Sequence, residues 1–475
     1  MDQEKIKRVQ HFKVIASEIV MVVAVILTVS ILVLIVSGYW LNSDFKVERQ
    51  GLLQISSIPT GADVDIDGDT SWLQRTNTSK TLFSGEHAIT LSKEGYDTWS
   101  KTITIREGLL YRVHYPRLFL SQRETEVVTS VDDTIFATVS PDRNTLLLAN
   151  KTMDWQIMFL NDEKIVPRKI NVGKLFAAST TSEESNAKLF SGEILSADWA
   201  KDNAHVLFKI KESDRIEWIM LDIENVKDSI NLSQKFDMDF DDVQIMNNSA
   251  NTLVVLQGQS LRRIDVASEQ ISAILADKVV SLDHYENEVI FVAKRQNDNA
   301  KEDEVTKEYG LYLLELGSGK TSELDQLEHP ARVVLSRFYD DKYITIVYEN
   351  DVTLLKEADL VKIDDYNLGF SPECIKVGHN GEFVLFYEGS NMATLDMEAL
   401  EITEWNIRTQ SFGWLDDDMI YTILDGNLVV YDFDGLNERE IAKNVASSFP
   451  VTITEDKWLY YFSDGSLVRE WLIKR

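Results

Sequence analysis

The chain has 475 residues, 44% of them hydrophobic and 27% charged, and a formal net charge of −30. This composition is typical of a globular protein with two or three domains, and a polyanion is a poor partner for nucleic acid because phosphates repel it. The single cysteine, Cys374, excludes an intrachain disulfide and a thiolate metal cluster.

The first predicted element is an uncharged apolar segment at residues 19–41, which ends in Tyr39, Trp40 and Leu41. As a helix it would be about 34 Å long, enough to cross a bilayer, and the two aromatic residues suit the membrane interface. A signal peptide is the alternative, but it would have a shorter apolar core and a small-residue cleavage site. We therefore predict an uncleaved transmembrane anchor.

The flanks of this segment predict its orientation. Four basic residues lie in residues 1–18, and two, Lys46 and Arg49, lie beyond the segment. Positive charge favours the cytoplasmic side. We expect a single-pass protein of the cytoplasmic membrane with a cytoplasmic head at residues 1–18 and the bulk of the chain outside the cytoplasm.

Residues 51–120 alternate between apolar and polar side chains, as half-buried antiparallel strands do. They resemble the PEGA domain, a small β-sandwich of cell-envelope proteins. The residues that carry the resemblance are Ser57, Pro59, Gly61, Ala62, Val64, Ile66, Asp67, Gly68, Gly85, His87, Ile89, Leu91, Gly95 and Tyr96. Thr60 stands where the family has glutamate, and Thr78-Ser79 lacks the family's T-P turn. The resemblance implies an envelope location and no particular ligand.

Asp63, Asp65 and Asp67 in this region also resemble the start of a calcium-binding EF-hand loop. Such a loop needs a bidentate glutamate at its twelfth position, which here is Gln74, and no amphipathic helix precedes it. We interpret the three aspartates as the solvent-facing side of a β-hairpin.

The remainder, residues 122–475, contains a repeat. Its clearest members are apolar second strands whose starting points lie 36 to 60 residues apart. They are NTLLLAN from Asn144, AHVLFKI from Ala204, NTLVVLQ from Asn251, NEVIFVA from Asn287, KYITIVY from Lys342, EFVLFYE from Glu382, DMIYTIL from Asp418 and KWLYYFS from Lys457. Periods near 40 with four strands each predict a β-propeller of eight blades, or seven if one unit is degenerate.

Two features complete the predicted propeller. The long intervals contain a low-complexity loop at residues 177–187 and a charged hairpin tip at residues 294–308. The last unit has only three strands, so we expect a segment near residues 122–129 to close it. Acidic turns such as Ser140-Pro141-Asp142 resemble those of bacterial TolB-like propellers. Trp199 and Trp414 precede such turns, and their repeated position favours packing between blades over sugar binding.

Motifs for chemistry are weak. Gly317-Ser318-Gly319-Lys320-Thr321 lacks the first glycine of a phosphate loop, since Leu314 occupies that position, and we interpret it as a hairpin turn. Two acid clusters, Asp237-Asp239-Asp241-Asp242 and Asp416-Asp417-Asp418, could hydrolyse glycosides only if two carboxylates faced each other across a groove. We interpret them as solvated turns and assign no catalytic, cofactor-binding or metal-binding residue.

The sequence therefore predicts an all-β, membrane-anchored binding or scaffold protein outside the cytoplasm, with envelope protein or glycan as its partner. A propeller offers a rigid rim built from many loops, and loops are where binding residues concentrate. The alternative is a propeller glycosidase or lyase that uses paired carboxylates. A sensor is a third hypothesis, disfavoured by the short cytoplasmic head.

Overall fold

The protein is described here from a computed structural model. It covers residues 3–36, 38–41, 47–176, 180–181, 188–246, 250–295, 307–358 and 360–474. Most of the predicted low-complexity loop and of the charged hairpin tip, and Lys46 of the predicted flank, lie outside these residues. The chain divides into two units, residues 1–122 with 473–475 and residues 123–472, and each is described by itself.

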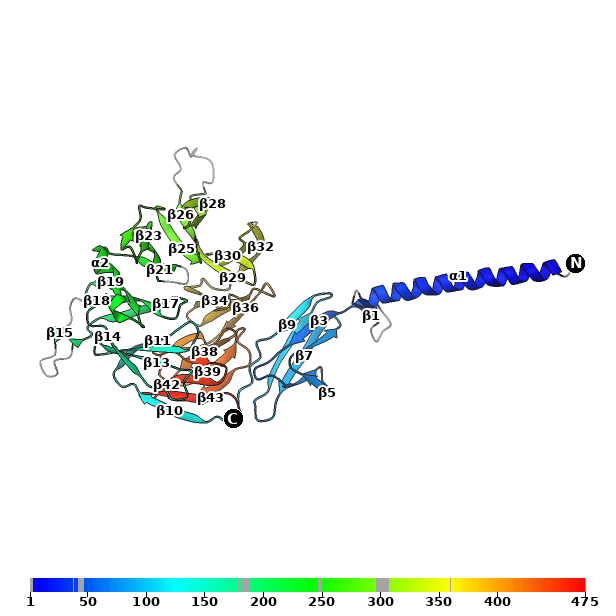
Figure 1. The fold of residues 1–475 in the computed structure, drawn as a ribbon, viewed down its shortest axis with the longest axis horizontal. Coiled ribbons are helices and arrows are strands. Elements are labelled where there is room, and N and C mark those ends of the chain that lie inside the picture. Colours follow the sequence, from blue (N-terminus) through cyan, green and yellow to red (C-terminus); the bar gives the residue numbers. More distant parts are fainter. Residues whose placement is uncertain are drawn as a thin grey trace. The chain divides into compact units, whose positions relative to one another are not determined.

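The N-terminal unit begins with helix α1 (Gln3–Val36) (Figure 1). Its part from Ile15 to Val36 is long and apolar enough to cross a membrane, and a signal sequence would pass the same test. The helix ends at Val36, before the end of the predicted segment at residue 41. Gly38 adopts a positive φ of 78° and donates its N–H to the carbonyl of Ile35, which ends the helix, as glycine commonly does. The chain then forms a short hairpin of β1 (Tyr39–Leu41) and β2 (Val47–Arg49).

The rest of this unit is a sandwich of two sheets, as the sequence predicts. One sheet has the order β6 (Thr78–Leu82), β3 (Gly51–Ile55), β9 (Leu110–Val113); the other has the order β5 (Asp69–Arg75), β4 (Asp63–Ile66), β7 (Gly85–Ser92), β8 (Trp99–Ile105). The alternating apolar side chains point inward. Leu53 and Ile55 of β3 and Ile89 and Leu91 of β7 are buried, whereas Leu52 of β3 is exposed.

The second unit consists mainly of four-stranded antiparallel sheets, which we number in chain order. Sheet 1 is β11 (Thr134–Val139), β12 (Thr145–Asn150), β13 (Asp154–Phe159), β14 (Arg168–Asn171); sheet 2 is β17 (Glu193–Trp199), β18 (His205–Glu212), β19 (Arg215–Asp222), β20 (Ile230–Asn231); sheet 3 is β21 (Asp242–Met246), β22 (Thr252–Gln257), β23 (Ser260–Asp265), β24 (Gln270–Ile271); sheet 4 is β25 (Val279–Tyr285), β26 (Glu288–Lys294), β27 (Tyr309–Glu315), β28 (Lys320–Leu327).

The later sheets follow the same pattern. Sheet 5 is β29 (Arg332–Phe338), β30 (Asp341–Tyr348), β31 (Asp351–Lys356), β32 (Val361–Asn367); sheet 6 is β33 (Cys374–Val377), β34 (Phe383–Glu388), β35 (Asn391–Asp396), β36 (Glu401–Asn406); sheet 7 is β37 (Ser411–Trp414), β38 (Met419–Leu424), β39 (Asn427–Asp432), β40 (Arg439–Ala442); sheet 8 is β41 (Thr452–Thr454), β42 (Trp458–Ser463), β43 (Ser466–Trp471), β10 (Thr125–Ser130). Minor elements are β15 (Thr180–Thr181), β16 (Lys188–Leu189), η1 (Val226–Asp228) and α2 (Leu232–Phe236).

The sheets form a closed ring. Hydrophobic clusters join sheet 1 to sheet 2, sheet 2 to sheet 3, and so on to sheet 7, and another cluster joins sheet 8 to sheet 1. Between sheets 7 and 8, Arg123, just before β10, donates a hydrogen bond to the carbonyl of Ile441 in β40 at 3.0 Å. Figure 1 shows the same progression from cyan through green and yellow to red. Every predicted second strand lies second in its sheet, with an inner run such as Leu146–Ala149 fully buried. The fold is a β-propeller. Eight as the number of blades stays a prediction, because parts of the chain lie outside the described residues.

The predicted closure of the ring is confirmed. Strand β10, at the start of this unit, pairs antiparallel with β43 at its end, with Thr125 opposite Glu470. Two ion pairs fix the contact: Arg123 with Glu470, and Arg469 with Glu126 at 2.8 Å. Tyr461 also donates its hydroxyl to Glu470 Oε2 at 3.2 Å. The closing strand thus completes the hydrogen bonding of a sheet edge that would otherwise be open.

Candidate binding site in the propeller channel

A cavity of about 500 Å³ lies where the first strands of sheets 2 to 6 run side by side and turn into their second strands. Its walls come from β17, β21, β25, β29 and β33 and from the turns that follow them. The wall residues are mostly polar or charged, because a first strand has one of its edges unpaired and lines the open centre of the ring. Pockets of this size accommodate small ligands or single side chains of a partner.

Three carboxylates lie in the wall: Asp198 of β17, Asp242 of β21 and Asp283 of β25. Burial raises the pKa of Asp198, and the charge of Asp242 raises it further. Burial also raises the pKa of Asp283 to about 6. Its side chain is still 29% exposed, since it lies deep in the protein but faces the open cavity. These shifts reflect the cost of holding a charge away from bulk water.

Asp283 has a defined position. Its Oδ2 accepts the backbone N–H of Leu335 on the neighbouring sheet at 2.7 Å, and its Oδ1 accepts that of His284 at 2.8 Å. Both hydrogen bonds lower its pKa, and burial outweighs them. Close by, Ser281 Oγ accepts the N–H of Val333 at 3.1 Å. Side chains of β25 therefore link sheets 4 and 5 along the cavity.

A series of hydrogen-bonded side chains continues from Asp283 and His284 to sheet 3. His284 Nδ1 lies 3.0 Å from Gln244 Oε1, and Gln244 Nε2 donates to Asp242 Oδ2 at 3.1 Å. Burial lowers the pKa of His284 to about 4, so the ring is neutral at pH 7. Because the amide oxygen of Gln244 only accepts, this hydrogen bond places a ring proton on Nδ1.

The turn end of the cavity carries cations around one aromatic ring. Lys201 Nζ lies 4.7 Å and Arg337 Cζ lies 5.9 Å from the ring centre of Tyr285. Arg337 also forms ion pairs with Glu286 at 3.5 Å and Asp340 at 3.8 Å. The cavity therefore has an acidic inner part and a mixed, partly cationic mouth.

The acid clusters singled out from the sequence separate in the structure. Of the seven aspartates only Asp242 lines the cavity. Asp239 pairs with Arg215 at 3.1 Å, and Asp241 accepts the N–H of Gly258 at 2.7 Å. In the other cluster Asp416 accepts the N–H groups of Asp418 and Met419, and Asp417 pairs with Arg143 at 3.1 Å.

The three aspartates of the N-terminal hairpin also have separate roles. Asp63 pairs with Arg75 at 3.1 Å, and Asp65 Oδ1 accepts the N–H of Gly68 at 2.8 Å. Asp67 Oδ1 accepts the N–H of Ala88, and its Oδ2 lies 2.6 Å from His87 Nδ1. The hydrogen bond from His87 lowers the pKa of Asp67. These carboxylates stabilise a turn and its neighbouring strand.

The remaining sequence motifs have structural roles. Residues 316–319 connect β27 to β28 as a hairpin, with Glu315 opposite Lys320, which confirms the hairpin turn predicted for the glycine-rich stretch. Trp199 packs on the cluster between sheets 1 and 2 and donates its Nε1–H to Thr138 at 2.9 Å. Trp414 packs on the cluster between sheets 6 and 7. The predicted packing between blades is confirmed for both.

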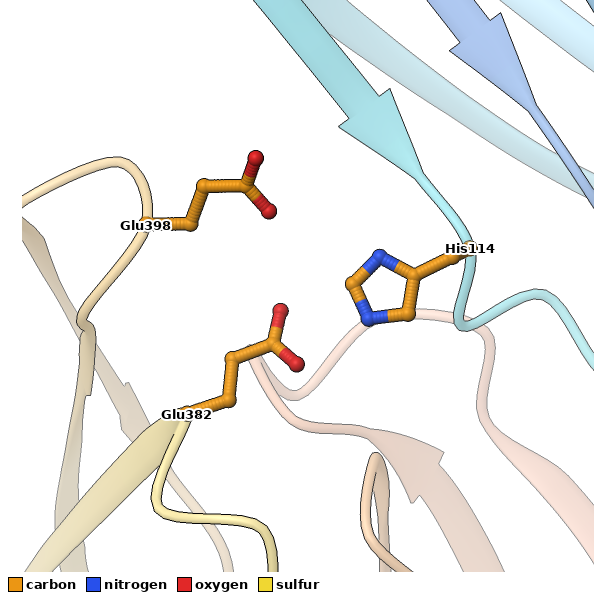
Figure 2. A group of neighbouring side chains, drawn as sticks. All are labelled: His114, Glu382 and Glu398. Atoms are coloured by element: carbon orange, nitrogen blue, oxygen red, sulfur yellow. The ribbon is translucent and has the colours of Figure 1, made fainter. Parts of the chain in front are cut away.

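Glu382 and Glu398 lie at the same edge of sheet 6, just before β34 and just after β35, and Figure 2 shows their carboxylates side by side. Glu382 is buried and accepts a hydrogen bond from the side chain of Asn380 at 3.1 Å. His114, drawn in the same figure, follows β9 in the N-terminal unit. Since the two units are described separately, we assign no site to the three side chains together.

Sequence reasoning missed Asp198, Asp283, His284, Gln244 and Ser336 as cavity residues. Each stands in a first strand, whose burial pattern is mixed rather than apolar. Polar residues within these first strands were the available signal. They are separated by tens of residues in the chain, so only the closed ring brings them together.

A comparison with known families agrees with the fold of the N-terminal unit. Residues 50–117 match the model of the PEGA domain. No curated protein matches the chain. Similar solved structures are an oligogalacturonate lyase in complex with manganese (15% identity, 59% of this chain and 89% of that chain, TM-score 0.39) and the Dos1 propeller (13%, 74% and 95%, TM-score 0.44). A third is the β-propeller domain of Cps50 (Swd1) from Myceliophteria thermophila (8%, 74% and 100%, TM-score 0.42). At these values they carry no argument about function.

Proposed function

We propose that this chain is a membrane-anchored binding or scaffold protein that presents its PEGA domain and its propeller outside the cytoplasm. The channel cavity would bind a part of an envelope protein or glycan. The observation that supports this proposal most strongly is the cavity itself, about 500 Å³ in volume and walled by polar side chains from five sheets. A rigid ring that gathers polar groups from many strands is suited to binding without chemistry.

Binding is tested by capture with matched variants. The full chain is purified in detergent, incubated with solubilised membranes and with an array of envelope glycans, and bound material is identified and rebound in pure form. Tyr285→Ala removes the ring between Lys201 and Arg337, whereas Tyr339→Ala removes an exposed ring outside the cavity. Wild type and Tyr339→Ala should bind alike, and Tyr285→Ala should bind weakly. Equal binding by all three would exclude the cavity as the site.

The anchor and its orientation are tested by protease digestion of intact cells. Helix α1 supports a membrane anchor, and the basic residues of the first 18 positions support a cytoplasmic head. Digestion should remove the propeller and leave only a short protected fragment. A fully protected propeller would contradict the proposed orientation, and a protein released without detergent would contradict the anchor.

A glycosidase or lyase is a second candidate, favoured by one observation. The pKa of Asp283, raised by burial to about 6, lies in the range of a general acid or base in a cavity. Both of its oxygens accept backbone N–H groups, which restricts its movement toward a substrate. Incubation with envelope polysaccharides, comparing wild type with Asp283→Asn, tests this role. Product formed by wild type and not by the variant would support it; no product would remove it.

A further inference from the structure

The inner part of the channel cavity carries negative charge without a matching positive charge. Within the described ranges, none of Asp198, Asp242 and Asp283 forms an ion pair with a lysine or arginine. Lys209, the basic residue that acts on Asp198, is directed elsewhere: its Nζ lies 4.9 Å from the ring of Trp218 and 3.4 Å from the carbonyl of Asp241. The acidic groups are thus available to a cation that enters from outside.

A second, independent observation lies in the same wall. Ser336 of β29 is only 2% exposed, and among the residues that the structure covers its Oγ has no hydrogen-bond partner. Buried hydroxyl groups are rarely left without a partner, so such a group in a cavity wall indicates a place for a polar ligand atom. A hydroxyl can accept a hydrogen bond from an N–H donor.

The geometry distinguishes an organic cation from a metal ion. A metal ion needs ligand oxygens about 2.0 to 2.6 Å away, which places them close to one another. In the described part of the chain, Asp198, Asp242 and Asp283 do not form a group whose ligand atoms lie within 4.8 Å of one another. An ammonium carries three N–H donors and a guanidinium five, and these donors can reach acceptors that are further apart.

The two cations at the mouth do not occupy the inner part. Arg337 is paired with Glu286 and Asp340, and Lys201 lies over Tyr285. A positively charged ligand in the cavity would therefore find Asp198, Asp242 and Asp283 in the wall without a lysine or arginine partner, and Ser336 in the same wall.

We infer that the channel binds the ammonium or guanidinium group of an organic cation, held by Asp198, Asp242, Asp283 and Ser336. In an envelope partner this group is the end of a lysine or arginine side chain. The inference rests on the proposed binding function and specifies which part of a ligand enters the cavity.

The probe is agmatine, which has a guanidinium at one end and an ammonium at the other, and its neutral counterpart is 1,4-butanediol. Calorimetric titration of the detergent-solubilised full chain at pH 7.5 and physiological salt should show saturable binding of one agmatine and none of the diol. Asp198→Asn should weaken agmatine binding about tenfold or more, the loss typical of a charged hydrogen bond.

The matched control is Asp239→Asn, which removes one negative charge at an exposed position outside the cavity. It should leave binding unchanged, and an equal loss in both variants would reveal unspecific attraction of cations to an acidic protein and overturn the inference. If Asp198→Asn unfolds, Asp242→Asn makes the same test from the neighbouring strand.

Failure of the inference can be told apart from failure of the proposed function. If agmatine does not bind while partner capture depends on Tyr285, the channel is a binding site for another chemistry and the inference is wrong. If agmatine does bind, a peptide with arginine, compared with the same peptide containing neutral citrulline, separates a side-chain ligand from a free amine. Preference for arginine that disappears in Asp198→Asn supports the inference as stated.

Discussion

The aspartates of the N-terminal hairpin, which form an acidic cluster in the sequence, and Asp283 of the propeller interior, which does not, differ in their surroundings. Asp67 is 49% exposed, and the hydrogen bond from His87 lowers its pKa. Asp283 accepts two backbone hydrogen bonds, yet burial raises its pKa to about 6. The comparison teaches that depth in the fold, and not the number of neighbouring acids, decides whether a carboxylate is poised for binding.

The largest expected effect on stability comes from removing the ion-pair partner of a buried carboxylate. Glu470 is 2% exposed and is paired with Arg123 where the ring closes. Arg123→Ala leaves this charge buried without that partner, which should lower the free energy of unfolding by about 3–5 kcal/mol. Urea denaturation of the full chain, followed by tryptophan fluorescence, measures the loss. A loss below about 1 kcal/mol would mean that the interior tolerates an unpaired carboxylate.

A smaller effect on stability is expected when Asp283 is replaced, and this effect depends on pH. Its pKa is raised in the folded state from an ordinary 3.8 to about 6, so folding becomes less favourable as pH rises through that range. Asp283→Asn keeps an acceptor for only one of the two backbone N–H groups, a cost that does not depend on pH, and it removes the penalty that does. The variant should gain about 1–3 kcal/mol relative to wild type between pH 4 and pH 7, by the linkage of pKa to stability. A difference that does not change with pH would contradict the raised pKa.

For the neighbouring His284, the change of stability with pH should have the opposite sign. Its pKa is lowered from 6.5 to about 4 by burial, so its contribution is present above pH 6.5 and is lost as pH falls toward 4. His284→Gln cannot titrate, and its stability relative to wild type should rise by about 1–3 kcal/mol over the same fall in pH. The measurement is urea denaturation at a series of pH values. Parallel curves for wild type and variant would show that the ring is not held neutral.

The smallest effect is expected in the N-terminal hairpin. Because the pKa of Asp67 is lowered, its contribution is present above the ordinary pKa and is lost as pH falls. Asp67→Asn should cost at most about 1 kcal/mol at pH 7, since the side chain is half exposed and solvent screens the interaction. Arg75→Ala, which breaks an exposed pair with Asp63, is the control and should change stability by less than about 0.5 kcal/mol. A larger loss of stability in either variant would show that the carboxylates of the hairpin contribute as much as those of the propeller interior.

The fold was largely predictable because its strongest signals are local. Second strands such as β12 lie in the middle of a sheet and pack on both faces, so their sequences are continuous apolar runs. The closing strand was predictable because the last unit lacks a fourth strand. The end of helix α1 was not, since a single glycine, Gly38, ends the helix within an apolar pattern that continues to Leu41.

The candidate site was not predictable in the same way. Asp242 was noticed only as a member of an acidic run, and its companions in that run point to other parts of the surface. Its actual neighbours in the cavity, among them Asp283 and Ser336, belong to other sheets. Some side chains of a first strand face a neighbouring sheet and others face the open centre. The sequence of a first strand therefore has no simple hydrophobic period. A site assembled in this way becomes visible only when the ring is closed.

The pairing of β10 with β43 has a consequence for how the chain folds during synthesis. The ribosome synthesises β10 more than three hundred residues before its partner, so the edge of β10 stays unpaired until β43 has emerged. A chain cut short before Ser466 keeps that edge exposed for good. Loss of β43 therefore exposes the backbone of β10, and a protease can recognise this unpaired strand.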